Sequence, residues 1–254
     1  MDKVVIITGA TSGIGLATAE YLIAKGCKVY GVARRPFEGN FKCFQADVCD
    51  TDAMVNIFDE VVKTEGRIDA LINNAGFGIA GAMEEATPEN VKKIVDVNLT
   101  ALCVLCGKIV PYMKSGGNIV NISSVGGIMP LPYQSMYSAT KAGVEVFSRA
   151  FANEVKRYKI KVSAVLPGDT KTDFTASRVF EGEDKTAKRS VDKMARDEQR
   201  GKDPVSVAKV IYKCLKKKHP PLRVSVGGLS KLEVFLSRFF STKALNRILG
   251  KMYG

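Results

Sequence analysis

Short runs of β-branched and apolar residues alternate with longer helical patterns along the first two thirds of the chain. Most of these runs are apolar on consecutive positions, which is typical of strands covered on both faces. They span Lys3–Thr8, Lys28–Ala33, Lys42–Ala46, Ile68–Asn73, Asn118–Ser123, Ile160–Leu166 and, later, Arg223–Val226. The helical patterns cover residues 14–26, 51–65, 88–113 and 137–158. This alternation predicts an α/β fold, a doubly wound parallel sheet of about seven strands with helices on both faces.

The pattern predicts a single domain over residues 1–254, because no linker rich in Pro, Gly or Ser interrupts it. Residues 174–203 are polar and heavily charged, and we interpret them as a flap outside the sheet. A helix is predicted over 204–217, with Asp203 as its cap and Pro204 in its first turn. We expect a cytoplasmic protein, since neither a secretory signal nor an apolar run of roughly 20 residues is recognised.

The excess of basic residues lies almost entirely in the last third of the chain. Residues 171–254 contain 20 of the 38 Lys and Arg but only 9 of the 26 Asp and Glu, and so carry most of the net charge of +12. Such a segment is either a solvated face or favours an anionic partner, which includes nucleic acid, an acidic protein, a membrane surface and an anionic substrate. Nucleic acid is not expected, because no platform of aromatic and basic residues accompanies the charge.

The six cysteines predict neither a disulfide framework nor a metal site. Cys103 and Cys106 have the C-x-x-C spacing, but a zinc site would need a second pair or nearby histidines, and His219 is the only histidine. We interpret the pair as two buried thiols on one helix face.

A glycine-rich turn joins the first predicted strand to the first helix. Its glycines allow close approach to a pyrophosphate, and the helix N-terminus offers free N–H groups to the phosphates. In this position the turn predicts a Rossmann-type, dinucleotide-binding domain. The residues expected around the dinucleotide are Gly9, Thr11, Ser12, Gly13, Ile14 and Gly15.

The end of the second predicted strand bears on the choice between NAD and NADP. Arg34 and Arg35 stand there, with no acidic residue before Glu38. A carboxylate would bond the ribose hydroxyls of NAD, whereas guanidinium groups bind the additional phosphate of NADP. We therefore predict NADP(H); the alternative is that both arginines only line a solvated loop.

Tyr137 and Lys141 are four residues apart on a predicted helix and therefore share one face. An ammonium beside a phenol favours the phenolate and lowers the tyrosine pKa from its usual value of about 10. Tyr137 is therefore a candidate general acid or base. Ser123 and Ser124 stand at the carboxyl end of a predicted strand, where ligands bind in open parallel sheets.

Together these motifs resemble the short-chain dehydrogenase/reductase family, in its classical group, over about residues 3–173. The matching motifs occur in the family's order: Thr8–Gly15, Asp47-Val48, Asn73-Asn74-Ala75-Gly76, Asn98, Ser124, Tyr137 with Lys141, and Pro167-Gly168 followed by Thr172. The resemblance implies reversible hydride transfer between NADP(H) and a ketone or secondary alcohol.

The resemblance also implies a catalytic role for four residues. Ser124, rather than Ser123, should hold the substrate oxygen, and Tyr137 should transfer the proton. Lys141 should grip the nicotinamide ribose, and Asn98 should hold a water that links Lys141 to solvent.

Further residues are implied to contact the cofactor. Asp47 should bond the adenine amino group, with Val48 packed beside it. Asn74, Ala75, Gly76, Pro167, Gly168, Thr170 and Thr172 should line the rest of the cofactor. One departure concerns NADP: many relatives place Lys or Arg just before the second motif glycine, where this chain has Ser12. The Ser12 hydroxyl can still bond a phosphate.

Substrate choice is expected to depend on residues 126–134, the flap and the C-terminal region. Val125–Tyr133 looks like the corresponding loop of 17β-hydroxysteroid dehydrogenases, and its apolar character favours a bulky steroid, retinoid or lipid substrate. One alternative is a 3-oxoacyl-carrier-protein reductase, whose basic last third would meet an acidic carrier protein. The other is a cofactor-sensing regulatory protein without catalysis.

Residues 229–254 have a basic amphipathic pattern that predicts a helical segment. Three interpretations stay open: a helix packed on the domain or across a subunit interface, a surface that touches membrane or lipid, and a lid over a bulky substrate. The family resemblance also implies a homodimer or homotetramer, built on the helices near 99–113 and 137–158.

Overall fold

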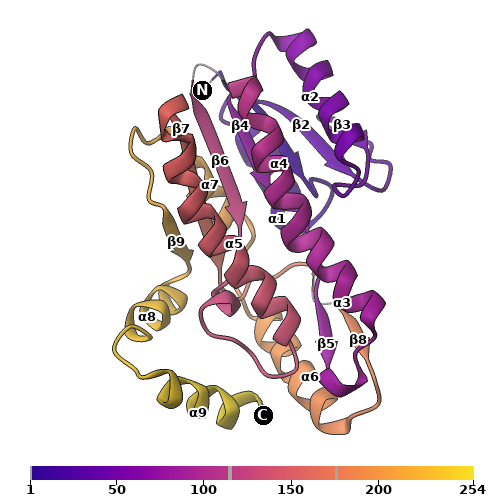
Figure 1. Cartoon of the computed structure of the whole chain (residues 1–254), viewed down its shortest axis with the longest axis vertical. Helices are drawn as coiled ribbons and strands as arrows, with labels where there is room; N and C mark the ends of the chain where they lie inside the picture. The colour runs from indigo at the N-terminus through magenta and orange to yellow at the C-terminus, as the bar shows by residue number, and fades with distance from the viewer. Residues whose placement is uncertain (1, 114–115, 175–176) are drawn as a thin grey trace.

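The computed structural model describes residues 2–113, 116–174 and 177–254. Its centre is a sheet of seven parallel strands in the order β3-β2-β1-β4-β6-β7-β9 (Figure 1). The strands are β1 (Val4–Thr8), β2 (Lys28–Ala33), β3 (Lys42–Gln45), β4 (Ala70–Asn73), β6 (Gly117–Ile122), β7 (Ile160–Pro167) and β9 (Arg223–Val226). The predicted parallel sheet is confirmed, and each strand begins and ends within two residues of its predicted bounds.

Helices cover both faces of the sheet because successive side chains of each strand point to opposite sides. From β1, Val4 and Ile6 belong to one buried cluster, and Val5 and Ile7 belong to the other. The first cluster is closed by α2 (Thr51–Glu65), α4 (Ala101–Ile109) and α5 (Ser135–Glu154). The second is closed by α1 (Gly13–Ile23) and α7 (Val205–Lys216), which lie behind the sheet in Figure 1.

A long helical stretch, Pro88–Met113, crosses the front of the sheet. It was predicted as one helix, but α3 (Pro88–Val95) and α4 are joined by a π-helical turn at Asp96–Thr100. Contrary to the sequence expectation, this stretch is long and apolar enough to cross a membrane, with a mean hydropathy of 1.7 in its most apolar part. The buried side chains of α4, Leu102, Leu105 and Ile109 among them, pack in the core, so we interpret it as a core helix.

The charged segment after β7 returns to the body of the molecule through a second, small sheet. β5 (Ile79–Gly81) pairs in parallel with β8 (Val179–Glu181), and α6 (Lys185–Gln199) follows. Neither strand was predicted, because each has three residues and pairs with a segment about 100 positions away. Asp184 caps α6 by accepting hydrogen bonds from the backbone N–H groups of Thr186 and Ala187.

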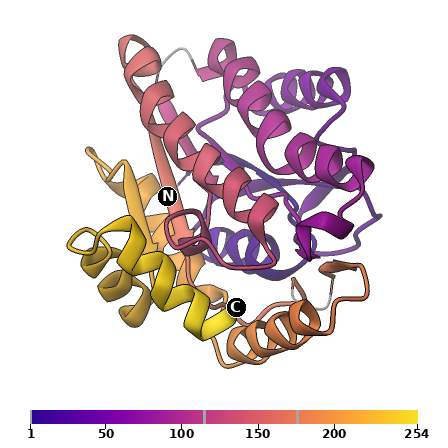
Figure 2. The ribbon, with the colours of Figure 1, turned by 60° about the horizontal axis from the view of Figure 1, so that its bottom comes forward.

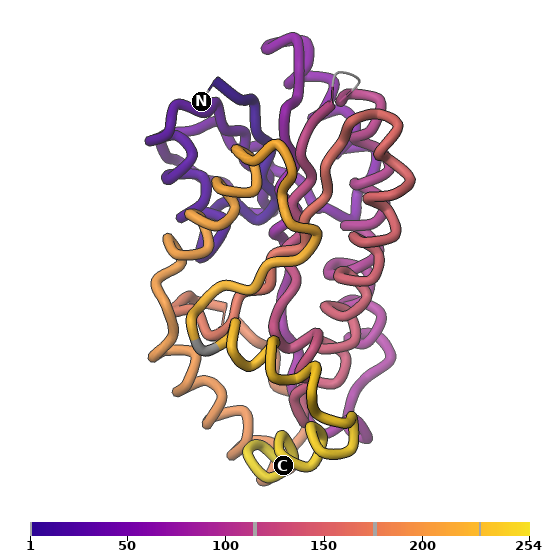
Figure 3. Tube along the Cα trace, turned by 90° about the vertical axis from the view of Figure 1, so that its left-hand side faces the viewer, coloured from indigo at the N-terminus to yellow at the C-terminus, as the bar shows by residue number. Residues whose placement is uncertain are grey.

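The C-terminal segment forms two helices, α8 (Gly228–Leu236) and α9 (Thr242–Tyr253), rather than one. Ser241 begins α9 by accepting a hydrogen bond from the N–H of Ala244. Figure 2 shows α9 beside α6, and hydrogen bonds join them: Ser190 Oγ donates to Tyr253 O, and Lys193 Nζ donates to Met252 O at 2.6 Å. Both C-terminal helices lie at the end of the molecule opposite the N-terminus (Figure 3).

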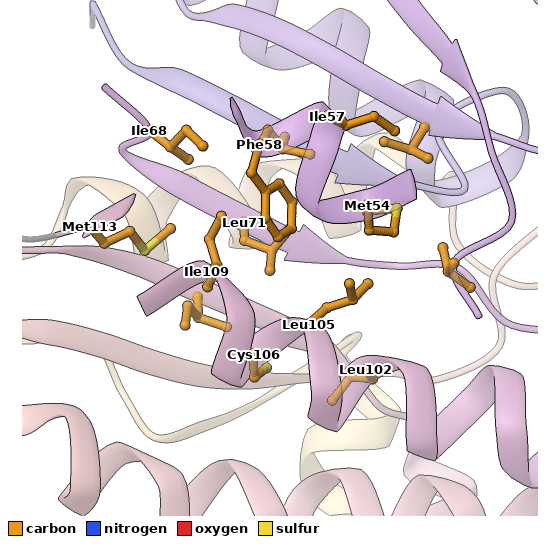
Figure 4. Close-up of a cluster of buried hydrophobic side chains, with 14 of the residues drawn as sticks. Met54, Ile57, Phe58, Ile68, Leu71, Leu102, Leu105, Cys106, Ile109 and Met113 are labelled. Carbon is orange, nitrogen blue, oxygen red and sulfur yellow. The ribbon is translucent and has the colours of Figure 1, made fainter. Parts of the chain in front are cut away.

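Phe58 lies in the middle of the first cluster, where α2 faces β4 and α4 (Figure 4). Because this side chain is fully buried, Phe58→Ala should lower the free energy of unfolding by about 3–5 kcal/mol. The measurement is urea unfolding followed by far-UV circular dichroism, since the chain has no Trp. The control is Tyr158→Ala, at an exposed side chain, which should change stability by less than about 1 kcal/mol. Equal losses in both variants would contradict this packing.

Candidate active site

The carboxyl ends of β1, β4, β6 and β7 meet at one edge of the sheet, because all strands are parallel. The strand order reverses between β1 and β4, and this switch point is where open parallel sheets bind their ligands. A cavity of about 740 Å³ opens there. The predicted site residues that line it are Gly9, Ser12, Gly13, Ile14, Arg35, Asn74, Ala75, Gly76, Ser124, Tyr137, Lys141, Pro167, Gly168, Thr170 and Thr172.

Hydrogen bonds hold the first turn against the end of β4. Asn74 Nδ2 donates to the carbonyl oxygens of Thr8, at 3.0 Å, and Gly9, at 3.1 Å. In return, Thr8 Oγ1 accepts from the backbone N–H groups of Asn74 and Ala75, at 3.0 Å each. These bonds fix the two strands on either side of the switch point, so the floor of the cavity is formed before any ligand binds.

The glycines of the turn leave room that larger residues would fill. A Cβ on Gly15 would collide with the carbonyl oxygen of Gly9, so α1 can approach β1 this closely only with glycine there. Gly13 has φ +51°, and a Cβ there would lie 3.3 Å from the Thr172 side chain. Within the described chain, the Ser12 side chain does not cap α1, so the N–H groups of its first turn face the cavity without a partner from Ser12.

These features fit a dinucleotide. A glycine turn that a Cβ would fill, an uncapped helix N-terminus and a cationic side chain at the same cavity are what a pyrophosphate and a further phosphate require. Of the two predicted arginines, Arg35 lines the cavity, whereas Arg34 is exposed outside it. Of the two, Arg35 is therefore the arginine that lies at the cavity.

Six predicted site residues lie outside the lining of the cavity: Thr11, Gly15, Arg34, Asp47, Val48 and Asn98. Asp47 makes a local hydrogen bond, in which its Oδ1 accepts from the N–H of Cys49 at 2.9 Å. Val48 is buried in the first cluster.

Asn98 stands in the π-helical turn and is almost fully buried. Its Oδ1 accepts from the N–H of Phe77 at 3.0 Å, and its Nδ2 donates to the Phe77 carbonyl at 2.9 Å. A Cβ on Gly76 would lie 3.0 Å from Asn98 Oδ1 and 3.4 Å from Lys141 Nζ, which places the amide close to the lysine. The water relay inferred for Asn98 stays a prediction.

The two adjacent serines have different surroundings. Ser123 is buried, and its Oγ donates to the Lys141 carbonyl at 2.7 Å, which ties β6 to α5. Ser124 is half-buried, accepts a hydrogen bond from the N–H of Gly126 at 3.1 Å, and makes a hydrogen bond with Tyr137. Ser124 is therefore the serine whose hydroxyl reaches the tyrosine.

Tyr137 and Lys141 are brought together, but their pKa values differ from the sequence prediction. Lys141 Nζ lies 5.8 Å from the centre of the Tyr137 ring and donates to the carbonyl of Ile122 at 2.9 Å. Burial raises the pKa of Tyr137, and the hydrogen bond with Ser124 only opposes that rise. Burial also lowers the pKa of Lys141 to about 8. The predicted lowering of the tyrosine pKa is therefore wrong for this structure, because desolvation of the buried phenol dominates.

Several residues of the cavity were missed from the sequence. Phe174 packs against Tyr137 with ring centres 5.6 Å apart, and Arg178 joins Phe174 to α6 through an ion pair with Glu198. Burial, helped by Glu198, raises the pKa of Asp169 at the cavity wall. The signal available was the position of Phe174 just after Thr172, where the charged segment begins.

α9 also forms part of the wall, through Ile248, Leu249, Met252 and Tyr253. Its amphipathic pattern was recognised, but the pattern alone left three interpretations open. Leu249 is buried while Ile248 and Met252 are exposed, so the helix both packs on the domain and borders the cavity.

Known proteins are similar to this chain over most of its length. The family model described as short chain dehydrogenase matches residues 3–182. A 3-ketodihydrosphingosine reductase from Bacteroides thetaiotaomicron is 39% identical over 238 residues, which are 89% of this chain and 88% of that protein. A 3-oxoacyl-(acyl-carrier-protein) reductase from Homo sapiens is 35% identical over 186 residues, 69% of this chain and 78% of that protein. The crystal structure of a short-chain dehydrogenase from Streptomyces avermitilis matches with TM-score 0.85 and 31% identity, covering 98% of this chain and 96% of that one.

The buried amine of Lys141 makes a testable contribution to stability. Its pKa is about 8 in the folded chain against an ordinary 10.5, so between these values the unfolded chain binds more protons and the free energy of unfolding rises with pH. Lys141→Met removes this contribution. The wild-type value minus the variant value should therefore rise by about 2 kcal/mol between pH 7.5 and 9.5, measured by urea unfolding. A difference that stays constant or falls with pH would contradict the burial of the amine.

Proposed function

Because the chain belongs to the short-chain dehydrogenase/reductase family, we propose that this oxidoreductase uses NADP(H) to reduce the ketone of a long-chain lipid. One observation carries the proposal: a single cavity contains the Ser124, Tyr137 and Lys141 side chains and also the apolar side chains of α9. A polar reacting group and a hydrocarbon chain can therefore occupy the same cavity. Burial raises the pKa of Tyr137, so the phenol holds the proton that reduction of a ketone requires.

The substrate class rests on the wall of the cavity. Met129 and Leu131, from the loop after β6, form apolar parts of it together with Ile248 and Met252. Asp169 and Glu233 also line this cavity with carboxyl groups, which suits a substrate that carries an amino group. We therefore propose a 3-keto long-chain base, the substrate class of the Bacteroides thetaiotaomicron relative, whose similarity spans 89% of the chain.

In the proposed reaction, the Tyr137 hydroxyl donates a proton to the carbonyl oxygen while Ser124 donates a hydrogen bond to the same oxygen. Lys141 holds a positive charge below its pKa of about 8 and stabilises the phenolate that Tyr137 leaves behind. A bound nicotinamide supplies the hydride. Burial of the site keeps these charges in a low-dielectric surrounding, where they act more strongly than in water.

The shape of the glycine-rich turn after β1 indicates which residues would hold NADP(H). The N–H groups of Gly13 and Ile14 suit the pyrophosphate, and Arg35 suits the additional phosphate of NADP, with Ser12 as a second donor. The 3-oxoacyl-carrier-protein reductase alternative keeps the same cofactor site. One observation favours it: the exposed basic side chains of α8 and α9, near the cavity, could meet an acidic carrier protein.

A substrate panel tests the proposed reaction. With NADPH, we expect turnover of 3-ketodihydrosphingosine at least about tenfold faster than of a 3-oxoacyl carrier protein or a 3-ketosteroid, measured as loss of NADPH absorbance. Tyr137→Phe should lower that turnover by about two orders of magnitude while leaving NADPH affinity nearly unchanged. Faster turnover of the acyl carrier protein or the steroid would overturn the substrate class. Bound NADPH without turnover of any ketone would favour the regulatory alternative.

The two arginines after β2 provide a matched test of cofactor choice. Arg35→Ala should raise the KM for NADPH at least about tenfold and leave the KM for NADH nearly unchanged, because a charge-assisted contact to the additional phosphate is lost. Arg34→Ala removes the same charge one residue away, outside the cavity, and should have a much smaller effect. A wild-type preference for NADH, or equal effects of the two substitutions, would contradict the assignment of Arg35.

A further inference from the structure

The exposed apolar side chains of the molecule gather at its C-terminus. Of the twelve large apolar side chains that are exposed in the described chain, seven lie on α8, α9 and the segment between them. They are Leu232, Phe235, Leu236, Phe239, Phe240, Ile248 and Met252. Phe239 is the most exposed, at 73%. In Figure 3 the two helices form the outer layer at that end of the molecule.

Basic side chains surround these apolar ones. Lys243, Arg247 and Lys251 follow at intervals of four residues and so form a stripe along α9, while Lys231 and Arg238 belong to α8 and the residues after it. All five are exposed, and none forms an ion pair with another residue that the structure describes. Residues 228–254 contain one carboxylate side chain, Glu233, which lines the cavity. We call these seven apolar and five basic residues the C-terminal face.

We propose that the C-terminal face docks on an anionic lipid surface. Apolar side chains on two short amphipathic helices enter the boundary between headgroups and acyl chains, and flanking Lys and Arg side chains bind the anionic headgroups. The three phenylalanines have no polar group of their own, so water is a poor environment for them, whereas a bilayer accepts them without a shaped partner.

A second copy of this chain is a poorer occupant of the same face. A twofold interface places the same patch on both sides, so five exposed cations would face five others. An acidic protein would match the charge, but it would also have to offer apolar surface for the exposed phenylalanines of α8 and the residues after it. A bilayer with anionic headgroups meets both requirements at once.

The C-terminal face is continuous with the active-site cavity. Ile248 and Met252 are exposed on this face and also line the cavity, and each follows directly on a basic residue of the stripe. A chain of a membrane lipid could therefore pass from the bilayer to the cavity along apolar side chains. This path to the substrate rests on the proposed function, whereas binding to lipid does not require it.

Cosedimentation of the whole chain with vesicles tests the docking. We expect binding to anionic vesicles, made of phosphatidylcholine with about 30% phosphatidylglycerol. Binding to pure phosphatidylcholine should be at least about tenfold weaker, and about 0.5 M salt should weaken binding to the anionic vesicles. Equal binding to both vesicles, or none to either, would overturn the proposal.

Paired variants separate this face from charge in general. Lys243→Glu with Arg247→Glu should weaken binding at least about tenfold, whereas Lys156→Glu with Arg157→Glu, an equal change of charge at another exposed site, should not. Phe239→Ser should weaken binding severalfold, and Leu222→Ser, at an exposed side chain elsewhere, should not. Equal losses in the matched variants would overturn the assignment of the face.

Further measurements test whether a second copy or a protein covers the C-terminal face instead of a bilayer. They also separate docking from the proposed reaction. If Phe239→Ser or the Lys243→Glu pair abolishes a dimer of the wild-type chain, seen by light scattering, a second copy covers the face and the proposal fails. Selective retention of the wild-type chain by an acyl carrier protein, lost in the Lys243→Glu pair, would likewise assign the face to a protein.

Turnover of a short, water-soluble ketone should be the same in wild type and variants. Vesicle binding needs no turnover, so failure of the proposed reaction and failure of docking give different results.

Discussion

The active site depends on the hydrogen bonds that tie Asn74 to the turn after β1. This turn and the end of β4 lie on either side of the point where the strand order reverses, and a parallel sheet leaves a crevice there. The backbone N–H of Gly9 also donates to the carbonyl of Val32 at 2.8 Å, so the turn is held from both neighbouring strands. The Asn74 amide and these backbone hydrogen bonds together fix the floor of the cavity that both the dinucleotide site and the catalytic side chains line.

Burial of Tyr137 and Lys141 shifts the pKa of each side chain toward its neutral form. The attraction between an ammonium and a phenolate, taken alone, would lower the tyrosine pKa. In the structure, desolvation raises the pKa of Tyr137 and lowers that of Lys141 to about 8, because both charged forms lose water. A protonated phenol beside an amine that is still mostly charged at neutral pH is a proton donor with a counterion in place. The same two residues therefore suit reduction through a different balance of forces from the one first expected.

Local patterns predicted what depends on neighbours in sequence. The strands, the glycine turn and the spacing of Tyr137 and Lys141 follow from residues within a few positions of one another, and the structure places them as expected. The pairing of β5 with β8, the contact between Phe174 and Tyr137, and the place of Arg35 rather than Arg34 at the cavity depend on segments far apart in the chain. The π-helical turn around Asn98 was missed because apolar periodicity does not distinguish it from a regular helix.

α9 shows why an amphipathic pattern alone left its role open. Leu249 is buried in the molecule, and Ile248 and Met252 border the cavity. The basic side chains Lys243, Arg247 and Lys251 face solvent. An amphipathic pattern distinguishes only a buried side from an exposed one, whereas this helix also has a side at the cavity. A helix that only packed on the domain would not leave Ile248 and Met252 exposed at the edge of a cavity. A helix that only closed the cavity would not need a stripe of exposed cations on its outer side. Both features make sense together if the molecule takes an apolar substrate from an anionic surface, because the helix that binds the surface is then also a wall of the site.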